Sequence, residues 1–235
     1  MLSATRGTEM TAAPAAPATP SEITVREVTS DEGMRDVIAL RERVYVADQG
    51  RLNSVDDTKD TFDKYDQHGT YLVAYRQAMP IGAVKLIRDS ELGLPCESTA
   101  KLTVDLAEFR ANGRLVEFGH LVSTPEVRSQ GVGMHLMRHG FMFSVGKLKA
   151  THILGDFFAD ADGNFQPFYS RIGFRPISEP YRDVRFAGSP LSIVGLVEIA
   201  AAFKIWREGS EGQRKVLDFF LSDYDQFATT AATRR

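Results

Sequence analysis

Apolar positions along the chain recur with two different spacings, and these spacings predict which segments are strands and which are helices. Runs that alternate apolar and polar residues, or are apolar throughout, predict strands at residues 23–28, 70–76, 81–88, 116–123, 153–159 and 174–177, with one more within 183–199. Apolar residues three or four positions apart predict helices at residues 30–48, 104–111, 131–147, 165–172, 200–208 and 213–227. The strand at 153–159 is apolar enough to be buried, and we expect it to run parallel to the strand at 116–123.

The turn after the strand at 116–123 has a composition suited to an anion. It reads Arg128-Ser-Gln-Gly-Val-Gly133, and a helix follows it. Glycines let the backbone turn tightly and approach a ligand, and a helix N-terminus adds a positive partial charge. Strand, turn and helix start together predict a pyrophosphate site. The pattern alone is common, and it lacks the glycine spacing of dinucleotide- and triphosphate-binding loops.

Composition favours one compact domain with short additions at both ends. The chain has 235 residues, of which 43% are hydrophobic, enough to bury a substantial core. Residues 1–20 are rich in Ala, Thr and Pro and are expected to form a disordered leader. We expect the folded domain over residues 21–199 and a helical extension over 200–235. A net charge of -3 with mixed signs gives no reason to expect a nucleic-acid partner.

The single cysteine, Cys96, excludes an internal disulfide and suits a reducing compartment. The most apolar window, residues 190–203, is too short to span a bilayer and contains Glu198. The sequence therefore predicts a cytoplasmic protein with no transmembrane segment. Asp63 and Asp66 lack a third ligand nearby, so we expect no metal site.

A second motif follows about forty residues after the glycine turn and reads Asn164-Phe-Gln-Pro-Phe-Tyr-Ser-Arg-Ile-Gly-Phe174. At this separation the two motifs resemble those of the GNAT superfamily of N-acyltransferases, over about residues 116–177. The resemblance implies an α+β fold, an αβα sandwich whose mixed, mostly antiparallel sheet contains a splayed parallel strand pair, with helices on both faces. It implies acyl-CoA or acyl-phosphopantetheine as donor, whose phosphates would be held by Arg128, Ser129, Gln130, Gly131, Val132 and Gly133.

The resemblance further implies that an amine attacks a thioester between the two splayed strands. Glu117, an acid in an otherwise apolar strand, is a candidate base because burial would raise its pKa. Tyr169 would protonate the leaving thiolate, and a strand N–H near Val122 would polarise the thioester carbonyl. His120 is the other candidate base. A flat strand would place it on the face opposite Glu117, and a bulge near Gly119 would bring the two together.

The N-terminal half resembles one branch of this superfamily, which contains acyl-homoserine-lactone synthases and long-chain N-acyl amino acid synthases. Four features recur in order: residues 40–45, the pair Asp63 and Asp66, residues 82–86, and the pair Glu117 and His120. The lactone synthases have arginines at the positions of Lys85 and His120 and a tryptophan near Arg51. These departures favour the amino acid synthases, which take acyl groups from acyl carrier protein.

From this comparison we expect five substrate-binding or pocket-supporting residues: Arg41, Asp63, Asp66, Lys85 and Phe141. Two alternatives stay open for them. Arg41 is either a solvated residue or part of the site, and the Glu117 carboxylate could satisfy a neighbour such as Arg41 instead of acting as a base. Phe141 either contacts the acyl chain or is an ordinary core residue of its helix.

The sequence therefore predicts an N-acyltransferase that moves a medium or long acyl group from acyl carrier protein or CoA to a small-molecule amine, most simply an amino acid. A short-chain acetyltransferase is one alternative, and it predicts a pocket blocked by Phe141 or Phe143. A non-catalytic thioester sensor is a second alternative, which would not require Glu117 and Tyr169. An autoinducer (acyl-homoserine-lactone) synthase is the third.

Overall fold

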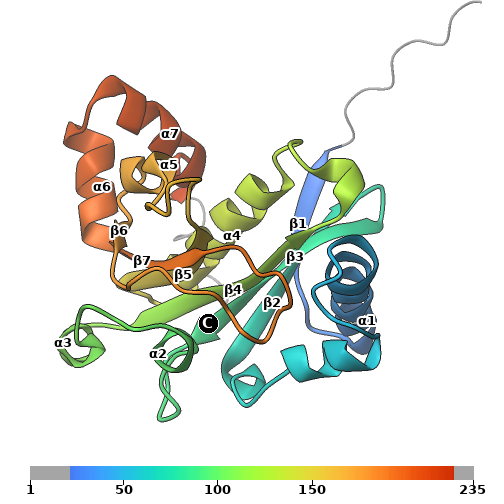
Figure 1. The fold of residues 1–235 in the computed structure, drawn as a ribbon. Coiled ribbons are helices and arrows are strands. Elements are labelled where there is room, and N and C mark those ends of the chain that lie inside the picture. Colours follow the sequence, from blue (N-terminus) through green and yellow to red (C-terminus); the bar gives the residue numbers. More distant parts are fainter. Residues whose placement is uncertain (1–21, 225–235) are drawn as a thin grey trace, which may run out of the picture.

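The computed structural model describes residues 22–224, which form a central seven-stranded sheet with helices on both faces (Figure 1). The strand order is β1-β2-β3-β4-β5-β7-β6. The strands are β1 (Ile23–Glu27), β2 (Gly69–Arg76), β3 (Met79–Arg88), β4 (Leu115–Ser123), β5 (His152–Phe158), β6 (Arg175–Pro176) and β7 (Ser192–Glu198). All neighbouring pairs are antiparallel except β4 and β5. The predicted fold class is confirmed. The predicted leader, residues 1–20, and the end of the predicted extension, residues 225–235, lie outside the described residues.

The predicted helices are observed with small shifts of their ends, except that the last one, predicted to run to residue 227, ends at Leu221. The α-helices are α1 (Asp31–Arg41), α2 (Cys96–Thr99), α3 (Leu106–Ala111), α4 (Val132–Gly146), α5 (Pro167–Arg171), α6 (Ile199–Glu208) and α7 (Glu211–Leu221). A π-helical segment (Glu42–Asp48) continues α1, and 3-10 turns occupy Asp56–Thr61, Asp66–His68 and Pro125–Val127. The turns and α2 were not predicted, because one-turn helices are too short to show an apolar period.

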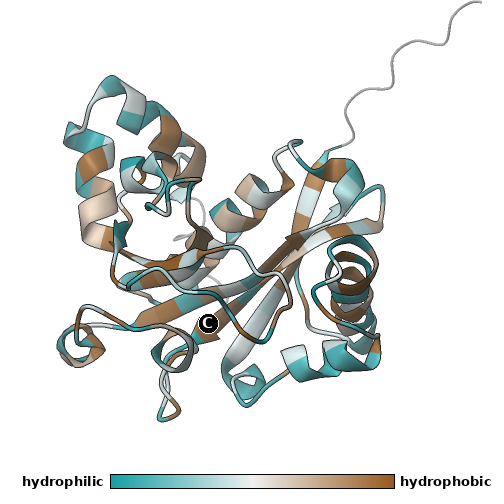
Figure 2. Cartoon of the chain, in the orientation of Figure 1, coloured by the Kyte–Doolittle hydropathy of each residue, from teal (hydrophilic) through white to brown (hydrophobic). Residues whose placement is uncertain are grey.

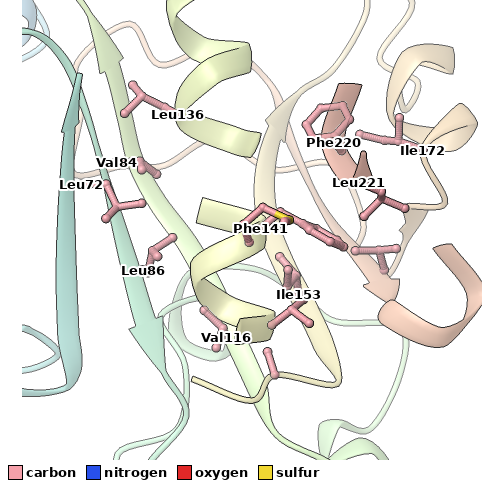
Figure 3. Packing of buried hydrophobic residues seen from close by; sticks show 14 of the residues in the cluster. Leu72, Val84, Leu86, Val116, Leu136, Phe141, Ile153, Ile172, Phe220 and Leu221 are labelled. Atoms are coloured by element: carbon pink, nitrogen blue, oxygen red, sulfur yellow. The ribbon is translucent and has the colours of Figure 1, made fainter. Parts of the chain in front are cut away.

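Alternation along β2 builds a separate core on each face of the sheet. Tyr71 and Val73 pack in the cluster that includes α1, whereas Leu72 and Ala74 pack in the cluster that includes α4. This is the period-two arrangement expected of a strand that is covered on both faces. Figure 2 shows hydrophobic residues along the middle strands, and Figure 3 shows the packing of the cluster on the α4 face.

The parallel strands β4 and β5 stay together for only part of their length. The paired stretch begins at Leu115 and His152 and ends at Phe118 and Gly155. Beyond that point β5 continues to pair with β7, and β4 continues to pair with β3. The strands therefore diverge on the carboxyl side of this pairing, as the splayed pair of the predicted fold requires.

A bulge in β4 lies directly after the divergence. Ala83 of β3 pairs with Val122, but Lys85 pairs with Gly119, so two steps on β3 match three on β4. His120, within the bulge, has a φ angle of +50°. An extra residue turns the following side chains to the other face of a strand. The bulge predicted near Gly119 is confirmed.

The two C-terminal helices share the core of the α4 face. Buried Ala202 of α6 and Leu217, Phe220 and Leu221 of α7 belong to the same cluster as Leu136 of α4 (Figure 3). Within residues 22–224, no helix combines the length and the apolar character that a membrane crossing demands.

Candidate active site

A cavity of about 350 Å³ lies where β4 and β5 diverge. β4 contributes residues 117–123 to its wall and β5 contributes residues 155–158. Tyr45, from the face covered by α1, and Met137 of α4, from the other face, both line it. The loop between β6 and β7, residues 177–191, also contributes to the wall and crosses in front of the sheet in Figure 1; we call it the strap. Since the lining comes from both faces, two molecules that enter from opposite faces would meet between the strands.

Glu117 lies on the β4 wall of the cavity, and its side chain is buried. Its Oε2 accepts a hydrogen bond of 3.1 Å from the backbone N–H of Cys96, at the start of α2. Burial raises the pKa of Glu117 to about 7. A carboxyl group with such a pKa exchanges its proton easily at neutral pH. The alternative that Glu117 satisfies Arg41 is wrong, since Arg41 donates its hydrogen bonds elsewhere.

His120 reaches the same cavity because of the bulge. Its Nδ1 lies 3.3 Å from the Tyr45 hydroxyl, and the Phe186 ring of the strap packs edge-on against it. Burial lowers the pKa of His120 well below its ordinary value, and the cations of Arg41, Lys85 and Arg185 lower it further. The ring is therefore neutral at pH 7 and a weak acceptor of protons.

Tyr169 of α5 also lines the cavity, at the side where α4 and α5 lie. Its ring packs on Phe157 of β5 with a centroid separation of 4.1 Å, and Phe165 and Phe168 surround it. Burial raises the pKa of Tyr169, so its hydroxyl keeps its proton at neutral pH. This phenol is available as a proton donor.

The glycine turn precedes α4 as the sequence predicts. Ser129 and Gly131 have φ angles of +64° and +82°, a tight left-handed geometry that glycine adopts without strain. No side chain caps the first turn of α4, and that turn contains no acidic residue. The first backbone N–H groups of a helix have no partner within it, so those of Val132 and Gly133 suit an anion. Arg128 lines the cavity and forms an ion pair with Asp48.

One network joins Arg41, Asp63, Asp66 and Lys85, in which the two cations are buried and the two aspartates are half-buried. The Lys85 ammonium lies 3.3 Å from Asp63 and 3.1 Å from Asp66. Arg41 is 1% exposed and donates to Thr61 and to the Tyr71 hydroxyl, so the alternative of a solvated Arg41 is wrong. Asp63 and Lys85 line the cavity, whereas Arg41 and Asp66 do not. Within the described residues, no three His, Cys, Asp or Glu side chains are grouped to hold a metal ion.

Phe141, the fifth expected substrate-binding residue, does not line the cavity. It is buried in the core of the α4 face together with Ile153 and Leu221 (Figure 3). The core alternative for this residue is the correct one. Met137, one turn earlier on α4, occupies the wall instead. A helix presents neighbouring turns to different surroundings when its partner strands diverge, and periodicity alone does not show where that happens.

Two parts of the cavity were not predicted. One is Asp156 of β5, and the other is the set of strap residues that line the wall: Tyr181, Asp183, Arg185, Phe186 and Ser189. Like Glu117, Asp156 is an acid within an apolar strand, so the sequence pattern could have identified it. The strap has no period or motif, so only the tertiary fold reveals that it crosses the cleft.

Comparisons with known proteins agree with this geometry. Residues 36–196 match the family model described as "N-acyl amino acid synthase FeeM". Among curated protein sequences, none matches the chain. The solved structure of FeeM, an N-acyl amino acid synthase from uncultured soil microbes, is similar with a TM-score of 0.60 and 16% identity, over 78% of this chain and 94% of that one.

Two further solved structures share the fold. Escherichia coli ElaA is 17% identical, with a TM-score of 0.52 over 75% of this chain and 100% of that one. An acyl-CoA N-acyltransferase from Pseudomonas aeruginosa is 20% identical, with a TM-score of 0.50 over 75% of this chain and 99% of that one.

Proposed function

The chain belongs to the family of N-acyl amino acid synthases that includes FeeM and is therefore an N-acyltransferase, and we propose that it transfers a medium or long acyl group from a thioester to the amine of an amino acid. The observation that carries this proposal is the cavity between β4 and β5, which Glu117 and Tyr169 both line. A thioester that enters from the α4 face and an amine that enters from the strap face would meet beside Glu117.

In the proposed reaction, Glu117 first takes a proton from the acceptor ammonium. The neutral amine attacks the thioester carbonyl carbon and forms the C–N bond, while backbone N–H groups near Val122 stabilise the oxyanion. The intermediate collapses as the C–S bond breaks. The leaving thiolate takes the proton of Tyr169, and the tyrosine anion takes the remaining excess proton from the nitrogen. Glu117 then releases its proton to solvent.

The choice of Glu117 over His120 as the base rests on their pKa values. A base works best when its pKa lies near the operating pH. The pKa of Glu117 is about 7, whereas burial holds that of His120 well below its ordinary value. We propose that His120 instead contacts the acceptor or the oxyanion through its ring and its link to Tyr45.

We propose that the donor phosphates bind at the turn formed by Arg128, Ser129, Gln130, Gly131, Val132 and Gly133. The uncapped first turn of α4 supports this assignment, because a helix N-terminus favours negative charge. The turn would hold the pyrophosphate of CoA or the phosphate of a carrier protein's phosphopantetheine. The pantetheine arm would then lie in the cavity that Arg128 and Tyr169 both line.

Replacing Gly133 with aspartate tests this donor site. A Cβ added there would meet nothing closer than the Leu121 side chain at 3.9 Å, and an acid in the first turn of a helix stabilises it. We therefore expect a folded enzyme whose KM for the donor rises roughly tenfold or more, since its own carboxylate competes with the phosphates. The acceptor KM should stay unchanged.

Gly133→Asn is the matched control, because it has the same shape without the charge. Steady-state kinetics with acyl-CoA and with an acyl-pantetheine that lacks phosphates separates the effect of the new charge on phosphate binding from any effect on the rest of the donor. If Gly133→Asp weakens both donors equally, the phosphates do not bind at this turn.

Arg51 supports an acceptor with a carboxylate, whereas Arg185, which also lines the cavity, is already engaged by acidic residues. Arg185 of the strap binds Asp183 through Nε and Nη2, while its Nη1 lies 3.9 Å from Asp63. Arg51 lies over the Phe158 ring at 5.2 Å, and within residues 22–224 it forms no ion pair with an acidic side chain. A guanidinium binds a carboxylate through paired hydrogen bonds, so an amino acid suits this wall better than a simple amine.

The apolar part of the lining supports an acyl group longer than acetyl. Val84, Phe118 and Met137 line the cavity, whereas Phe141 and Phe143, the residues expected to block it in an acetyltransferase, do not. A volume of about 350 Å³ lies at the lower end of the range for ligand pockets.

The test is to incubate the protein with acyl thioesters of roughly two to sixteen carbons, each as the CoA form and as the carrier-protein form. Each thioester is combined either with a single amino acid or with the amine that results from its decarboxylation. We expect N-acyl amino acid by mass spectrometry, with more product from amino acids than from the matching amines. Equal use of both acceptors would contradict an amino acid substrate. Product from acetyl thioester alone would favour an acetyltransferase.

A further inference from the structure

A second carboxylate faces Glu117 across the cleft. In the paired part of the two strands, Glu117 of β4 lies opposite Leu154 of β5. Side chains two residues apart on a strand point to the same face, so Asp156 lies on the face of Leu154 and of Glu117, one step further along. The pairing has ended by then, at Phe118 and Gly155. The two acids therefore stand on opposite walls at the point where the cleft opens, and both line the cavity.

Both carboxylates can be reached from the cavity, although the hydroxyls of Ser192 and Tyr181 lie beside Asp156 and lower its pKa. Glu117 uses one oxygen, Oε2, to accept the Cys96 N–H, which fixes its direction and leaves Oε1 for another partner. Asp156 is accessible through the cavity. Gly119, the next residue of β4 on the side of Glu117, has no side chain, so it places no bulk beside the two acids.

The pKa values of the two acids agree with this placement. Enclosure in the cleft raises the pKa of Asp156 to about 6, and the charge of Asp156 adds to the effect of burial on Glu117. The other charged or titratable groups that act on the pair are Cys96, Tyr181, Asp183 and Arg185. Arg185 is the only cation among them, and it is engaged by Asp183.

Two neighbouring acids that repel each other in a cleft offer a site for a cation. We propose that Asp156 and Glu117 together bind the ammonium group of the acceptor, with Asp156 as the contact that stays ionised while Glu117 takes the proton. This inference rests on the proposed transfer to an amine. It assigns a substrate-binding residue on β5, in addition to the base on β4.

The division of roles follows from charge. The ammonium is attracted by two carboxylates, so it binds more tightly than a neutral amine. When Glu117 accepts its proton, the site contains one carboxylate and one carboxylic acid, and the neutral amine is no longer held by an ion pair. The amine is thereby released for attack on the thioester. The proton that leaves the nitrogen is the proton that appears on Glu117, and no other reactant is required.

Asp156→Asn is the variant that tests the proposal. It keeps the size of the side chain and removes its charge. We expect the KM for an amino acid to rise roughly ten- to a hundredfold, because one charge-assisted hydrogen bond is lost. With hydroxylamine, a nucleophile that is uncharged at neutral pH, the KM should change little. Asp162→Asn, the same substitution on an exposed residue outside the cavity, is the matched control.

A titration of Glu117 gives a second measurement, which would not change if Asp156 had only a structural role. Asp156→Asn removes a negative neighbour of Glu117, so the pKa of the Glu117 carboxyl, followed by carbon-13 NMR in the free enzyme, should fall below about 7. Asp156→Glu, which restores the charge, should restore that pKa and most of the amino acid KM. These measurements do not depend on turnover.

The outcomes separate the two proposals. If wild-type enzyme forms no amide with any amine, the proposed function fails, and the Glu117 titration together with calorimetric binding of a free amino acid still tests the ammonium site. If Asp156→Asn raises the KM of hydroxylamine and of the amino acid equally, or leaves the Glu117 pKa unchanged, the paired site is wrong.

Discussion

Replacing Glu117 with glutamine should lower kcat/KM for the amine acceptor by about 10²- to 10⁴-fold, the usual contribution of a general base. Glutamine has the same shape, and its amide oxygen can still accept the hydrogen bond from the Cys96 N–H. Binding of the donor thioester should therefore stay within a factor of about two. Stopped assays of amide formation and equilibrium titration with a non-hydrolysable donor analogue measure the two quantities separately.

The pH dependence of the wild-type enzyme follows from the same group. Glu117 acts only when it has lost its proton, so kcat/KM should rise with pH through about 7 and then level off. His120 as the base would place this rise at a much lower pH, since burial lowers its pKa. In Glu117→Gln the rise near pH 7 should be absent from the remaining activity.

The same substitution should stabilise the protein at alkaline pH. The pKa of Glu117 is about 7 in the folded protein and about 4.5 in an unfolded chain. Between these values the folded state retains a proton that the unfolded state has lost, so the free energy of unfolding falls as pH rises from about 4.5 to about 7. At pH 8 the whole cost, about 3 kcal/mol, is present. Glu117→Gln removes it and should raise the free energy of unfolding at pH 8 but not at pH 4.

Glu198→Gln is the control for this pair of effects, because Glu198 is exposed and lies outside the cavity. It should change neither turnover nor stability by a measurable amount. A Glu117→Gln enzyme that is slow and also unstable at pH 8 would mean that the ionised carboxylate supports the fold, and that the loss of activity is indirect.

Local patterns in the sequence were sufficient for the elements and for part of the site. The period of the apolar residues identified all seven strands and the longer helices, because each of these buries a regular face. Glu117 was visible as an acid in an apolar strand, and the glycine turn was visible from residues that adjoin one another. The bulge at His120 was expected from the resemblance, since nothing in the spacing of β4 itself reveals an extra residue.

Contacts between segments that are distant in the sequence could not be predicted from local patterns. The strap reaches the cavity from a segment without periodicity, and Phe186 meets Tyr45 only in the folded chain. Phe141 and Met137 lie one turn apart on α4, yet one is core and the other is cavity wall. The difference depends on where β4 and β5 diverge, which is a property of the sheet rather than of the helix.

The network around Lys85 is the clearest case in which the structure changes the expected role of residues. Lys85 has a side chain with no exposed area and lies between Asp63 and Asp66. Asp66 also accepts from the Tyr71 hydroxyl, which in turn accepts from Arg41. This chain of ion pairs and hydrogen bonds joins β2 and β3 to α1 and to the segment that follows it. We therefore propose that it supports the acceptor wall and does not bind the acceptor directly.

Lys85→Met should reduce the free energy of unfolding by about 3 kcal/mol, because removal of the buried lysine leaves the two half-buried carboxylates of Asp63 and Asp66 without their cation. For a domain of ordinary stability this is a large fraction of the total, and the melting temperature should fall by roughly 10 °C. Differential scanning calorimetry at neutral pH measures both. Lys59→Met is the control, since the Lys59 pair with Asp56 is fully exposed and such pairs contribute little.

The triple variant Lys85→Met, Asp63→Asn, Asp66→Asn distinguishes a supporting network from a substrate-binding one. It removes both carboxylates together with the lysine and leaves Arg41 its hydrogen bonds to Thr61 and Tyr71, and replacing a buried ion pair by neutral groups of similar size is often close to neutral for stability. If the network only supports the wall, the triple variant should regain most of the lost stability and keep its acceptor KM within a factor of about five. If Asp63 and Lys85 bind the acceptor, the variant will be stable but its acceptor KM will rise strongly. Measurement of both quantities on one protein sample separates the two roles, because only direct binding predicts a stable enzyme that has lost its acceptor.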